Sequence, residues 1–389
     1  MAYISHYLNV RPSFGYTLSR NTVLSMYNLK DLYFHYSSIV IMKNVKNLTI
    51  AIVVVVIAIA GIFAYKSKWM SSTQSNTEQA DGLFPGKIKV GHLIALDMAP
   101  LFVAKEEGFF EDEGLDVELA FFSNPGDNNA ALAGGSLQFH INPFTLPYFG
   151  ENSGVPMRII STAGGLEIMQ VVIQGQYDVE SMKQLAEWVN DNPDEKLKVG
   201  TLRGDTLDMI LYKSFADVGL TYDDFEMVWF NDLLAMVETF RTKEIAILSH
   251  IKPYTTDLIV NYDAEVLTDN DTVWGKGTPN TTIVVLEDFL EQYPETVRRY
   301  LRATYKGFDL IVNDPERAVA LLSNGNYFKI DEDVLLYAFK NQPKEVLLHP
   351  NVDGMTIAIE DMIKQNYIKR PKQSIVKTEI LDEVVREFQ

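Results

Sequence analysis

The chain has 389 residues, of which 47% are hydrophobic and 22% are charged. This composition excludes wholesale disorder, and at about 150 residues per domain the length suffices for about two domains. The net charge of −18, from 34 basic and 52 acidic residues, argues against a general nucleic-acid binder, because phosphate backbones require clustered Lys and Arg. The absence of cysteine excludes disulfides, thiol nucleophiles, thiolate metal sites and lipid attachment through a lipobox cysteine.

An uncharged apolar run, LTIAIVVVVIAIAGIFA, occupies residues 48–64. At about 1.5 Å rise per residue it would span about 26 Å, the short end of the range for a bilayer. Two interpretations are open: an uncleaved signal-anchor, or a cleaved signal peptide with an A-x-A site at residues 58–60. The length of the run favours the transmembrane anchor, and its apolar character on every face disfavours a buried core helix. Both membrane interpretations place the rest of the chain outside the cytoplasm.

The N-terminal part is expected to have three sections. Residues 1–41 receive no function, since Met42 precedes the basic stretch KNVK and translation is expected to begin there, with Met26 as the alternative. Residues 42–69 form the signal-anchor segment. Residues 70–86, MSSTQSNTEQADGLFPG, have the composition of a flexible tether, and the folded part is expected to start near Lys87.

From residue 87 onward, strand and helix patterns alternate with short connections. Strands are expected at 87–94, 115–122, 137–142, 157–163, 171–174, 197–202, 225–230, 244–250 and 281–286. Helices are expected at 100–110, 126–135, 143–152, 178–192, 205–218, 233–243 and 287–313, the last broken at Pro294, and most of the remainder is helical. This alternation predicts an α/β fold with largely parallel sheets.

Catalytic and cofactor motifs are absent from the sequence. It contains no GxGxxG after a first strand, no GxxxxGK[ST], no HExxH and no GxSxG. None of the six histidines pairs with another at metal-ligand spacing. We therefore expect no metal, no cofactor and no enzymatic activity.

The segment IKVGHLIALDMAPLFVAKEEGFFEDEGLDVEL resembles the opening of the solute-binding proteins for nitrate, taurine, sulfonates and thiamine-precursor pyrimidines, the NMT1/THI5-like family. The matching positions are Ala99, Pro100, Leu101, Ala104, Gly108, Phe110, Gly114, Leu115 and Val117. Further similar stretches include LKVGTLRGDTLDMIL and EDFLEQYPETVRRYLRATYKGFDLIVNDPERAVALL, so that the resemblance spans roughly residues 87–330.

The resemblance implies a bilobed periplasmic-binding-protein-like type II fold, with two α/β lobes joined by two crossing strands and the ligand in the cleft. Lobe 1 would comprise residues 87–170 and 275–389, and lobe 2 residues 171–274. It further implies a monomeric, extracytoplasmic substrate-binding subunit of an ABC importer. Such a subunit closes on a small organic solute (sulfonate or taurine-like, nitrate-like, or a thiamine-precursor pyrimidine) and delivers it to a permease driven by an ATPase.

Two other functions are open on the same fold. A pyrimidine-synthase-like enzyme would need the cysteine-rich motif of those synthases, which this chain lacks. A ligand-sensing receptor ectodomain would signal through the membrane helix, and the short stretch before residue 48 disfavours it.

The loops after two strands of lobe 1 supply the first candidate ligand residues. His92 and Asp97 flank the loop after the first strand, and Asp97 contacts the ligand, caps the next helix, or does both. Gly164 and Gly165 end a later strand, where they allow close approach of the backbone to a ligand or form a plain tight turn.

Asn142, Phe144 and Thr145 lie where the strand at 137–142 meets a helix that Pro143 is expected to start. Asn142 is either the N-cap of that helix or a ligand contact, and Phe144 is either core or cleft wall.

The segment Arg203, Gly204, Asp205 and Thr206 joins a strand to a helix, and the resemblance places the ligand there. The helix N-terminus carries partial positive charge. Asp205 and Asp208 form a cap-like D-x-x-D pair that would occupy some of its donors, which weakens the case for a bare anion such as nitrate. Arg203 pairs either with a sulfonate or carboxylate, or with Asp205.

His250, Tyr254 and Trp274 complete the candidate site. Tyr254 and Trp274 have rings that stack on a flat or apolar ligand. His250 is either a ligand contact or, as is commoner for a lone histidine, structural.

Overall fold

The computed structural model describes residues 82–164, 167–342 and 348–389. Residues Ala80–Gln389 form a compact unit separate from Met1–Gln79. The expected signal-anchor at 42–69 lies outside the described residues. Within the described part, no helix combines the length and the apolarity needed to cross a membrane.

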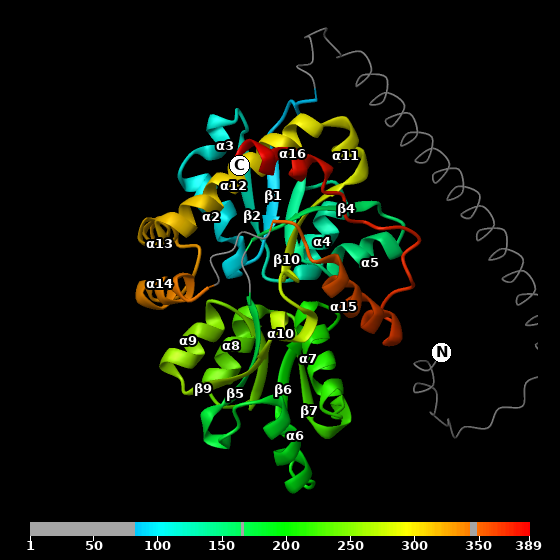
Figure 1. Ribbon diagram of the computed structural model, residues 1–389, viewed down its shortest axis with the longest axis vertical. Coiled ribbons are helices and arrows are strands. Elements are labelled where there is room, and N and C mark those ends of the chain that lie inside the picture. Colours follow the sequence, from blue (N-terminus) through cyan, green and yellow to red (C-terminus); the bar gives the residue numbers. More distant parts are fainter. Residues whose placement is uncertain (1–81, 165–166, 343–347) are drawn as a thin grey trace, which may run out of the picture. The chain divides into compact units, whose positions relative to one another are not determined.

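Two five-stranded sheets form the cores of two lobes (Figure 1). In spatial order, the lobe 1 sheet contains β2 (Val117–Phe121), β1 (Ile88–His92), β3 (Phe139–Pro143), β10 (Thr281–Leu286) and β4 (Met157–Thr162). The lobe 2 sheet contains β7 (Glu226–Phe230), β6 (Lys198–Leu202), β8 (Ile247–Ile251), β5 (Met169–Gln174) and β9 (Ala264–Asp269).

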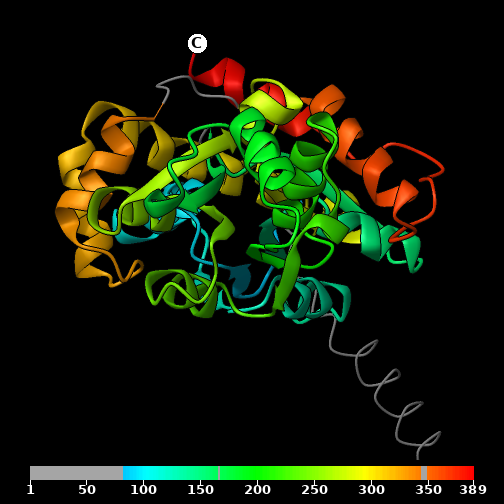
Figure 2. The same ribbon diagram turned by 90° about the horizontal axis from the view of Figure 1, so that it is seen from below.

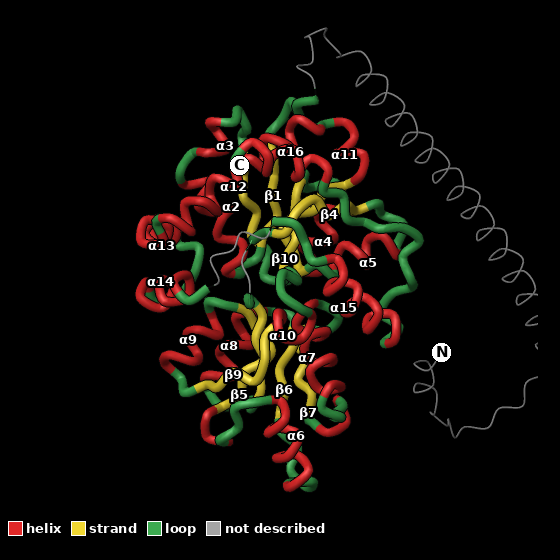
Figure 3. Tube along the Cα trace, in the orientation of Figure 1, coloured by secondary structure: helices red, strands yellow, loops and turns green. Residues whose placement is uncertain are grey.

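Helices flank both sheets (Figures 2 and 3). Those associated with lobe 1 are η1 (Leu96–Met98), α2 (Ala99–Glu106), α3 (Phe109–Asp112), α4 (Pro125–Ala133), α5 (Leu146–Asn152), α11 (Glu287–Gln292), α12 (Pro294–Asn313), α13 (Pro315–Asn324), α14 (Glu332–Lys340), α15 (Val352–Lys364) and α16 (Glu379–Glu387). Those of lobe 2 are η2 (Gly175–Tyr177), α6 (Met182–Asp191), α7 (Thr206–Asp217), η3 (Tyr222–Asp224), α8 (Leu233–Arg241), α9 (Tyr254–Asn261) and α10 (Asn270–Trp274).

Each sheet has one reversed strand. β10 is antiparallel to both of its neighbours, and so is β5, while the remaining strands of each sheet share one direction. Both reversed strands follow a passage of the chain from one sheet to the other, since β5 comes after β4 and β10 comes after β9 and α10. The predicted α/β fold with largely parallel sheets is therefore confirmed.

Local sequence explains most element boundaries. Asn124, Ser181 and Asp232 cap the helices α4, α6 and α8 through their side chains. Pro294 separates α11 from α12, as predicted, because proline fits the first turn of a helix and interrupts its interior. The central strands β3, β5 and β8 are buried along their whole length, as expected for sheets covered by helices on both faces.

Two details were not expected from the sequence. The region after β8 contains α9, β9 and α10, for which no element was predicted. Phe84 packs on Phe289 and Tyr293, and its N–H donates to Thr296 Oγ1 at 2.7 Å, so contacts with the folded part begin before Lys87. The residue boundaries given for the two lobes remain a prediction.

Candidate ligand-binding site

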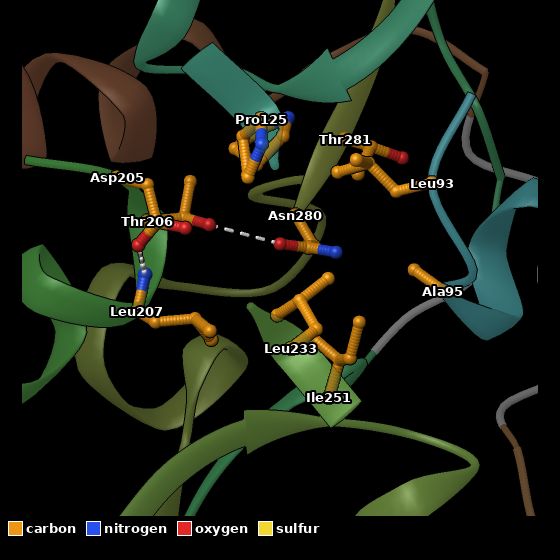
Figure 4. Close-up of a pocket in the computed structure, with 11 residues that line it drawn as sticks. Leu93, Ala95, Pro125, Asp205, Thr206, Leu207, Leu233, Ile251, Asn280 and Thr281 are labelled. Carbon is orange, nitrogen blue, oxygen red and sulfur yellow. Dashed lines mark hydrogen bonds between the residues drawn. The ribbon is translucent and has the colours of Figure 1, made fainter. Parts of the chain in front are cut away.

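The carboxyl ends of β1 and β3 in lobe 1 meet those of β6 and β8 in lobe 2 around a small cavity, here called the central cleft (Figure 4). Its lining residues are Leu93, Ala95, Pro125, Pro143, Asp205, Thr206, Leu207, Leu233, Ile251, Asn280 and Thr281. The cavity measures about 10 Å³, which is room for about one water molecule. Strand ends and helix N-termini from both lobes thus converge on one buried point.

Direct hydrogen bonds hold the lobes together around the central cleft. The N–H of Leu96 donates to the carbonyl of Lys252 at 2.9 Å. Thr206 Oγ1 donates to Asn280 Oδ1 at 3.0 Å, a bond visible in Figure 4. These contacts define a closed arrangement, so a solute larger than water can enter only when the lobes separate.

Asp97 lies behind the lobe 1 wall of the cleft. Its Oδ2 accepts from the N–H of Thr281 at 3.0 Å and from Thr281 Oγ1 at 2.6 Å, while Asn280 Nδ2 lies 3.5 Å from Oδ1. Burial raises the pKa of Asp97 to about 6, and the hydrogen bonds from Thr281 and Asn280 oppose the shift. The capping interpretation of Asp97 is wrong, because α2 has no side-chain cap and Asp97 instead positions the start of β10.

Asp205 and Thr206 form the lobe 2 wall. Asp205 Oδ1 accepts from the N–H groups of Leu207 at 2.8 Å and Asp208 at 3.4 Å, which confirms the predicted N-cap of α7. Gly204 has a φ of +80°, a left-handed conformation that suits glycine, and its N–H donates to Asp208 Oδ2 at 2.7 Å. Burial, together with the charge of Asp208, raises the pKa of Asp205 to about 8.

Asp208 is fully buried behind Asp205 and joins α7 to lobe 1. Its Oδ2 accepts from the hydroxyl of Tyr367, in the segment after α15, at 2.8 Å. The hydroxyl of Tyr222 also donates to its carboxylate. Burial raises the pKa of Asp208, and hydrogen bonds from Tyr222, Gly204 and Tyr367 oppose the shift.

The predicted group at the end of β3 supports the cleft from behind. Asn142 lies within β3 and donates to the carbonyl of Pro125 at 3.0 Å. Its interpretation as an N-cap is wrong, because β3 runs through Pro143 and α5 begins only at Leu146. The oxygen Oδ1 of Asn142 is buried without a hydrogen-bond partner in the described part.

Phe144, Thr145 and Trp274 pack beneath the central cleft and do not line it. The rings of Phe144 and Trp274 meet edge to face with centroids 5.7 Å apart, and the N–H of Phe144 donates to the carbonyl of Asn280 at 3.0 Å. Thr145 is fully buried, and its hydroxyl has no partner among the described residues. Trp274 is buried against Phe144 and presents no open ring surface to the central cleft.

His92 and Tyr254 line a second hollow, here called the side groove. It measures about 730 Å³ and includes Phe121 and Tyr327 of lobe 1 and Leu234 of lobe 2. Nδ1 of His92 donates to the carbonyl of Leu93 at 2.8 Å, and burial lowers the pKa of His92. Neither His92 nor Tyr254 lines the central cleft.

Of the other predicted residues, His250 and Gly164 do not line the central cleft. His250 Nε2 donates to the carbonyl of Leu233 at 2.9 Å, and burial lowers the pKa of His250 to about 4, so this histidine is neutral and structural. Gly164 has a φ of +106°, and a Cβ there would lie 2.8 Å from the ring of Phe308. Gly165 lies outside the described residues.

The positive charges near the cleft are directed elsewhere. The guanidinium of Arg203 lies over the ring of Trp229, 4.2 Å from its centroid, and has no ion pair with Asp205. Lys252 Nζ lies 3.9 Å from a carboxylate oxygen of Glu167, and burial lowers its pKa. In residues 82–164, 167–342 and 348–389, no cluster of three or more His, Cys, Asp or Glu forms a metal site.

Asn280 and Thr281 are the polar lining residues of the central cleft that sequence reasoning missed, and its apolar lining residues were not predicted either. Both residues lie where the chain returns from lobe 2 to lobe 1. Thr281 is the first residue of β10 and pairs with Pro143 at the end of β3. The available signal was their position: a polar TPNTT stretch directly before the apolar strand IVVL. The sequence indicates Asp208 only as part of the D-x-x-D cap, and no local pattern singles out Tyr367.

Two curated proteins are similar to this chain in sequence. A formylaminopyrimidine-binding protein of Halalkalibacterium halodurans is 25% identical over 237 residues, which is 57% of this chain and 64% of that protein. A protein of Brucella abortus (strain 2308) that is named as a binding protein is 24% identical over 272 residues, 67% of this chain and 74% of that protein.

Solved structures show the same fold. The alkanesulfonate-binding protein of Xanthomonas axonopodis pv. citri, bound to MOPS, matches with a TM-score of 0.63 and 12% identity over 76% of this chain and 99% of that chain. The periplasmic nitrate-binding protein of Synechocystis PCC 6803 matches with a TM-score of 0.66 and 17% identity over 78% of this chain and 89% of that chain. The bilobed periplasmic-binding-protein fold expected from the sequence is thereby confirmed.

The sequence profile of the NMT1-like family matches residues 82–323, which is more than half of the chain and includes every residue of the central cleft. The resemblance seen in the sequence is confirmed, and the chain belongs to the NMT1-like family.

Proposed function

We propose that this protein is the extracytoplasmic substrate-binding subunit of an ABC importer, which captures a small organic solute in the central cleft and delivers it unchanged to a permease driven by an ATPase. The observation that supports this most directly is the convergence of both lobes on a buried polar point. Thr206 and Asn280 form a direct bond across it, visible in Figure 4. The chain passes from one sheet to the other after β4 and returns before β10.

Closure is the physical basis of the proposed function. A solute that contacts both lobes stabilises the closed form in proportion to its differential affinity for closed over open. The cavity of about 10 Å³ is too small for a sulfonate or a pyrimidine, so in this proposal the cleft widens around a bound solute while bonds between the lobes away from it, such as that of Tyr367 with Asp208, persist. A micromolar affinity corresponds to about −8 kcal/mol, within reach of a few hydrogen bonds and apolar enclosure.

We assign the ligand contacts to Asp205 and Thr206 of lobe 2 and to Asn280 and Thr281 at the start of β10. Asp97 positions the latter pair. The solutes named for similar proteins, which include alkanesulfonate, nitrate and formylaminopyrimidine, set the range to test. The apolar run at 48–64 serves as a membrane anchor in this proposal, or as a signal peptide if cleaved, and the protein acts as a monomer.

The test is a thermal-shift screen of the full-length chain against nitrate, taurine, alkanesulfonates, aminopyrimidines and a broad metabolite library. Solution scattering is then recorded with and without each compound that shifts the melting temperature. A ligand at a hundred times its Kd should add about 2.7 kcal/mol to the free energy of unfolding, and the scattering profile should change as the lobes rearrange. Absence of any stabilising solute, or chemical alteration of a bound one, would contradict the proposal.

A further inference from the structure

The central cleft has only one ionisable side chain among its lining residues, and that side chain is an acid. Asp205 is 4% exposed, while the other lining residues are apolar or neutral. No neighbouring cation lines the cleft: Arg203 lies over Trp229 and acts on the charge of Asp208, and Lys252 Nζ lies 3.9 Å from Glu167. A bare anion placed here would lose its hydration without gaining a positive partner, which is costly.

The N–H groups that commonly bind anions at a helix N-terminus are already occupied in α7. Those of Leu207 and Asp208 donate to Asp205 Oδ1, and that of Gly204 donates to Asp208 Oδ2. The carboxylates of Asp205 and Asp208 therefore already accept from the N–H groups around the first turn of α7. Few N–H donors remain there for an oxyanion.

The lobe 1 wall is similarly poor in donors. The N–H of Thr281 is used by Asp97. Pro125 and Pro143 both line the cleft, and proline has no N–H to offer. The wall opposite Asp205 therefore adds no positive charge.

Asp205 has spare accepting capacity towards the cleft. Both of its hydrogen bonds end on Oδ1, and in the described part of the chain Oδ2 accepts none. A carboxylate offers about four lone-pair sites, so Oδ2 is free to accept from a solute in the cleft. A hydrogen-bond donor that carries positive charge would pair with the ionised form of Asp205 and balance its charge.

We infer that the central cleft recognises a solute through a protonated nitrogen, of the amine, amidine or guanidine type, which donates to Oδ2 of Asp205. This inference rests on the function proposed above and narrows its solute class. A free oxyanion such as nitrate or a simple alkanesulfonate is then a poor ligand of this protein.

The number of protons released on binding is a second measurable consequence of the inference. Burial raises the pKa of Asp205 to about 8, so at pH 7 the empty cleft holds this group mainly neutral, and a cationic solute must displace its proton. An anion would instead leave this proton in place and bind with little change in proton number. The other ionisable groups near Asp205 are Asp208 with its partners Tyr222 and Tyr367, Arg203, which acts on the charge of Asp208, and Asp97, which Asn280 links to Thr206.

The test uses three pairs of probes that are similar in shape and opposite in charge: guanidinium and nitrate, benzamidinium and benzenesulfonate, ethylammonium and ethanesulfonate. Binding to the full-length chain is measured by calorimetry at pH 7 in two buffers of different ionisation enthalpy. We expect the cation of at least one pair to bind about tenfold or more tightly than its anion, with proton release.

Asp205→Asn should reduce this preference to about twofold or less, because the amide is uncharged while asparagine remains a good N-cap and preserves α7. Asp217→Asn is the matched control: it lies at the exposed end of the same helix, where it pairs only with Lys213, and should leave the preference unchanged.

Tighter binding of the anions, or a preference that survives Asp205→Asn, overturns the inference but leaves a solute-binding function in place. Failure of every cationic probe to bind also overturns the inference. The proposed function is then decided separately by the metabolite screen and the scattering measurements.

Discussion

The central cleft and the side groove are both hollows at the junction of the lobes, and they differ in almost every property. The side groove measures about 730 Å³ and the central cleft about 10 Å³. Yet residues from both lobes meet at the cleft through buried polar groups, whereas the groove is formed mostly by lobe 1. In a hinged protein the site between the lobes shrinks as the lobes close. In a closed structure the larger hollow is therefore not necessarily the ligand site.

The walls of the two hollows also differ in character. The groove has a half-exposed ring, Phe121, with 54% of its surface exposed, and ordinary surface charges such as Lys105 and Glu118. The cleft has a buried acid that accepts backbone hydrogen bonds, and its walls are joined by the Thr206–Asn280 bond. Substitutions in the cleft should therefore alter both closure and affinity, and substitutions in the groove should alter neither.

The largest effect is expected from Ala95→Phe, which fills the cleft. Ala95 is fully buried and lines the cavity, so a benzyl group there holds the lobes apart. We expect an affinity loss of about a hundredfold or more for the solute found in the screen, and a larger radius of gyration by scattering. Phe121→Ala in the groove is the paired variant and should change affinity less than about twofold. A greater loss of affinity for Phe121→Ala than for Ala95→Phe would show that the solute binds in the side groove.

The next effect concerns pH. The folded-state pKa values of Asp97 and Asp205 are raised to about 6 and about 8, so the folded protein holds protons that the unfolded chain has released above pH about 4. Stability therefore falls as pH rises, through pH 6 for Asp97 and through pH 8 for Asp205. Between pH 6 and 8 the loss should be on the order of 2 to 3 kcal/mol, measured by chemical denaturation.

Asp205→Asn should remove most of that slope, and the part that remains belongs to Asp97 near pH 6 and to Asp208, whose pKa is also raised. Asp217→Asn should retain the whole slope. Equal slopes in wild type and Asp205→Asn would show that Asp205 titrates as an exposed acid, and the contrast between a buried cleft and an open groove would be lost.

Local sequence patterns were sufficient for much of this architecture. The alternation of apolar strands and amphipathic helices predicted the α/β fold, Pro294 located a helix boundary, and Asp205 with Asp208 predicted the cap of α7. These features depend on neighbours within a few residues, which the sequence displays directly.

The assembly of the site depends on contacts that no local pattern encodes. Asp97 and Thr281 are separated by 184 positions and meet only because the chain crosses between the sheets twice. Arg203 was expected to face a ligand or Asp205, but the ring of Trp229, from the neighbouring strand β7, accepts it. His250 and Trp274 are likewise of residue types that often contact ligands, but both are buried in the core. His250 bonds to the carbonyl of Leu233, and Trp274 packs on Phe144.

A moderate effect is expected from Tyr367→Phe, which removes the hydroxyl that donates to Asp208 Oδ2 across the lobes. Asp208 retains its bonds from Tyr222 and Gly204, so α7 should remain folded. Because a hydrogen bond to a charged group is worth about 1.5–3 kcal/mol, we expect affinity to fall about tenfold through a weaker closed state. Tyr337→Phe, at an exposed tyrosine of α14, is the control and should have no effect on calorimetric Kd.

The smallest effect is expected at the solvent-exposed rim, where Asn124 Nδ2 donates to the carbonyl of Asn231 at 2.9 Å between the lobes. Asn124→Ser removes this donor yet keeps an acceptor for the N–H groups of Gly126 and Asp127, so α4 keeps its cap. Water replaces a lost bond at an exposed position, and affinity should fall about threefold or less by calorimetry. If Asn124→Ser weakened binding more than Tyr367→Phe, the rim would control closure, and the buried polar groups of the cleft would act on the solute alone.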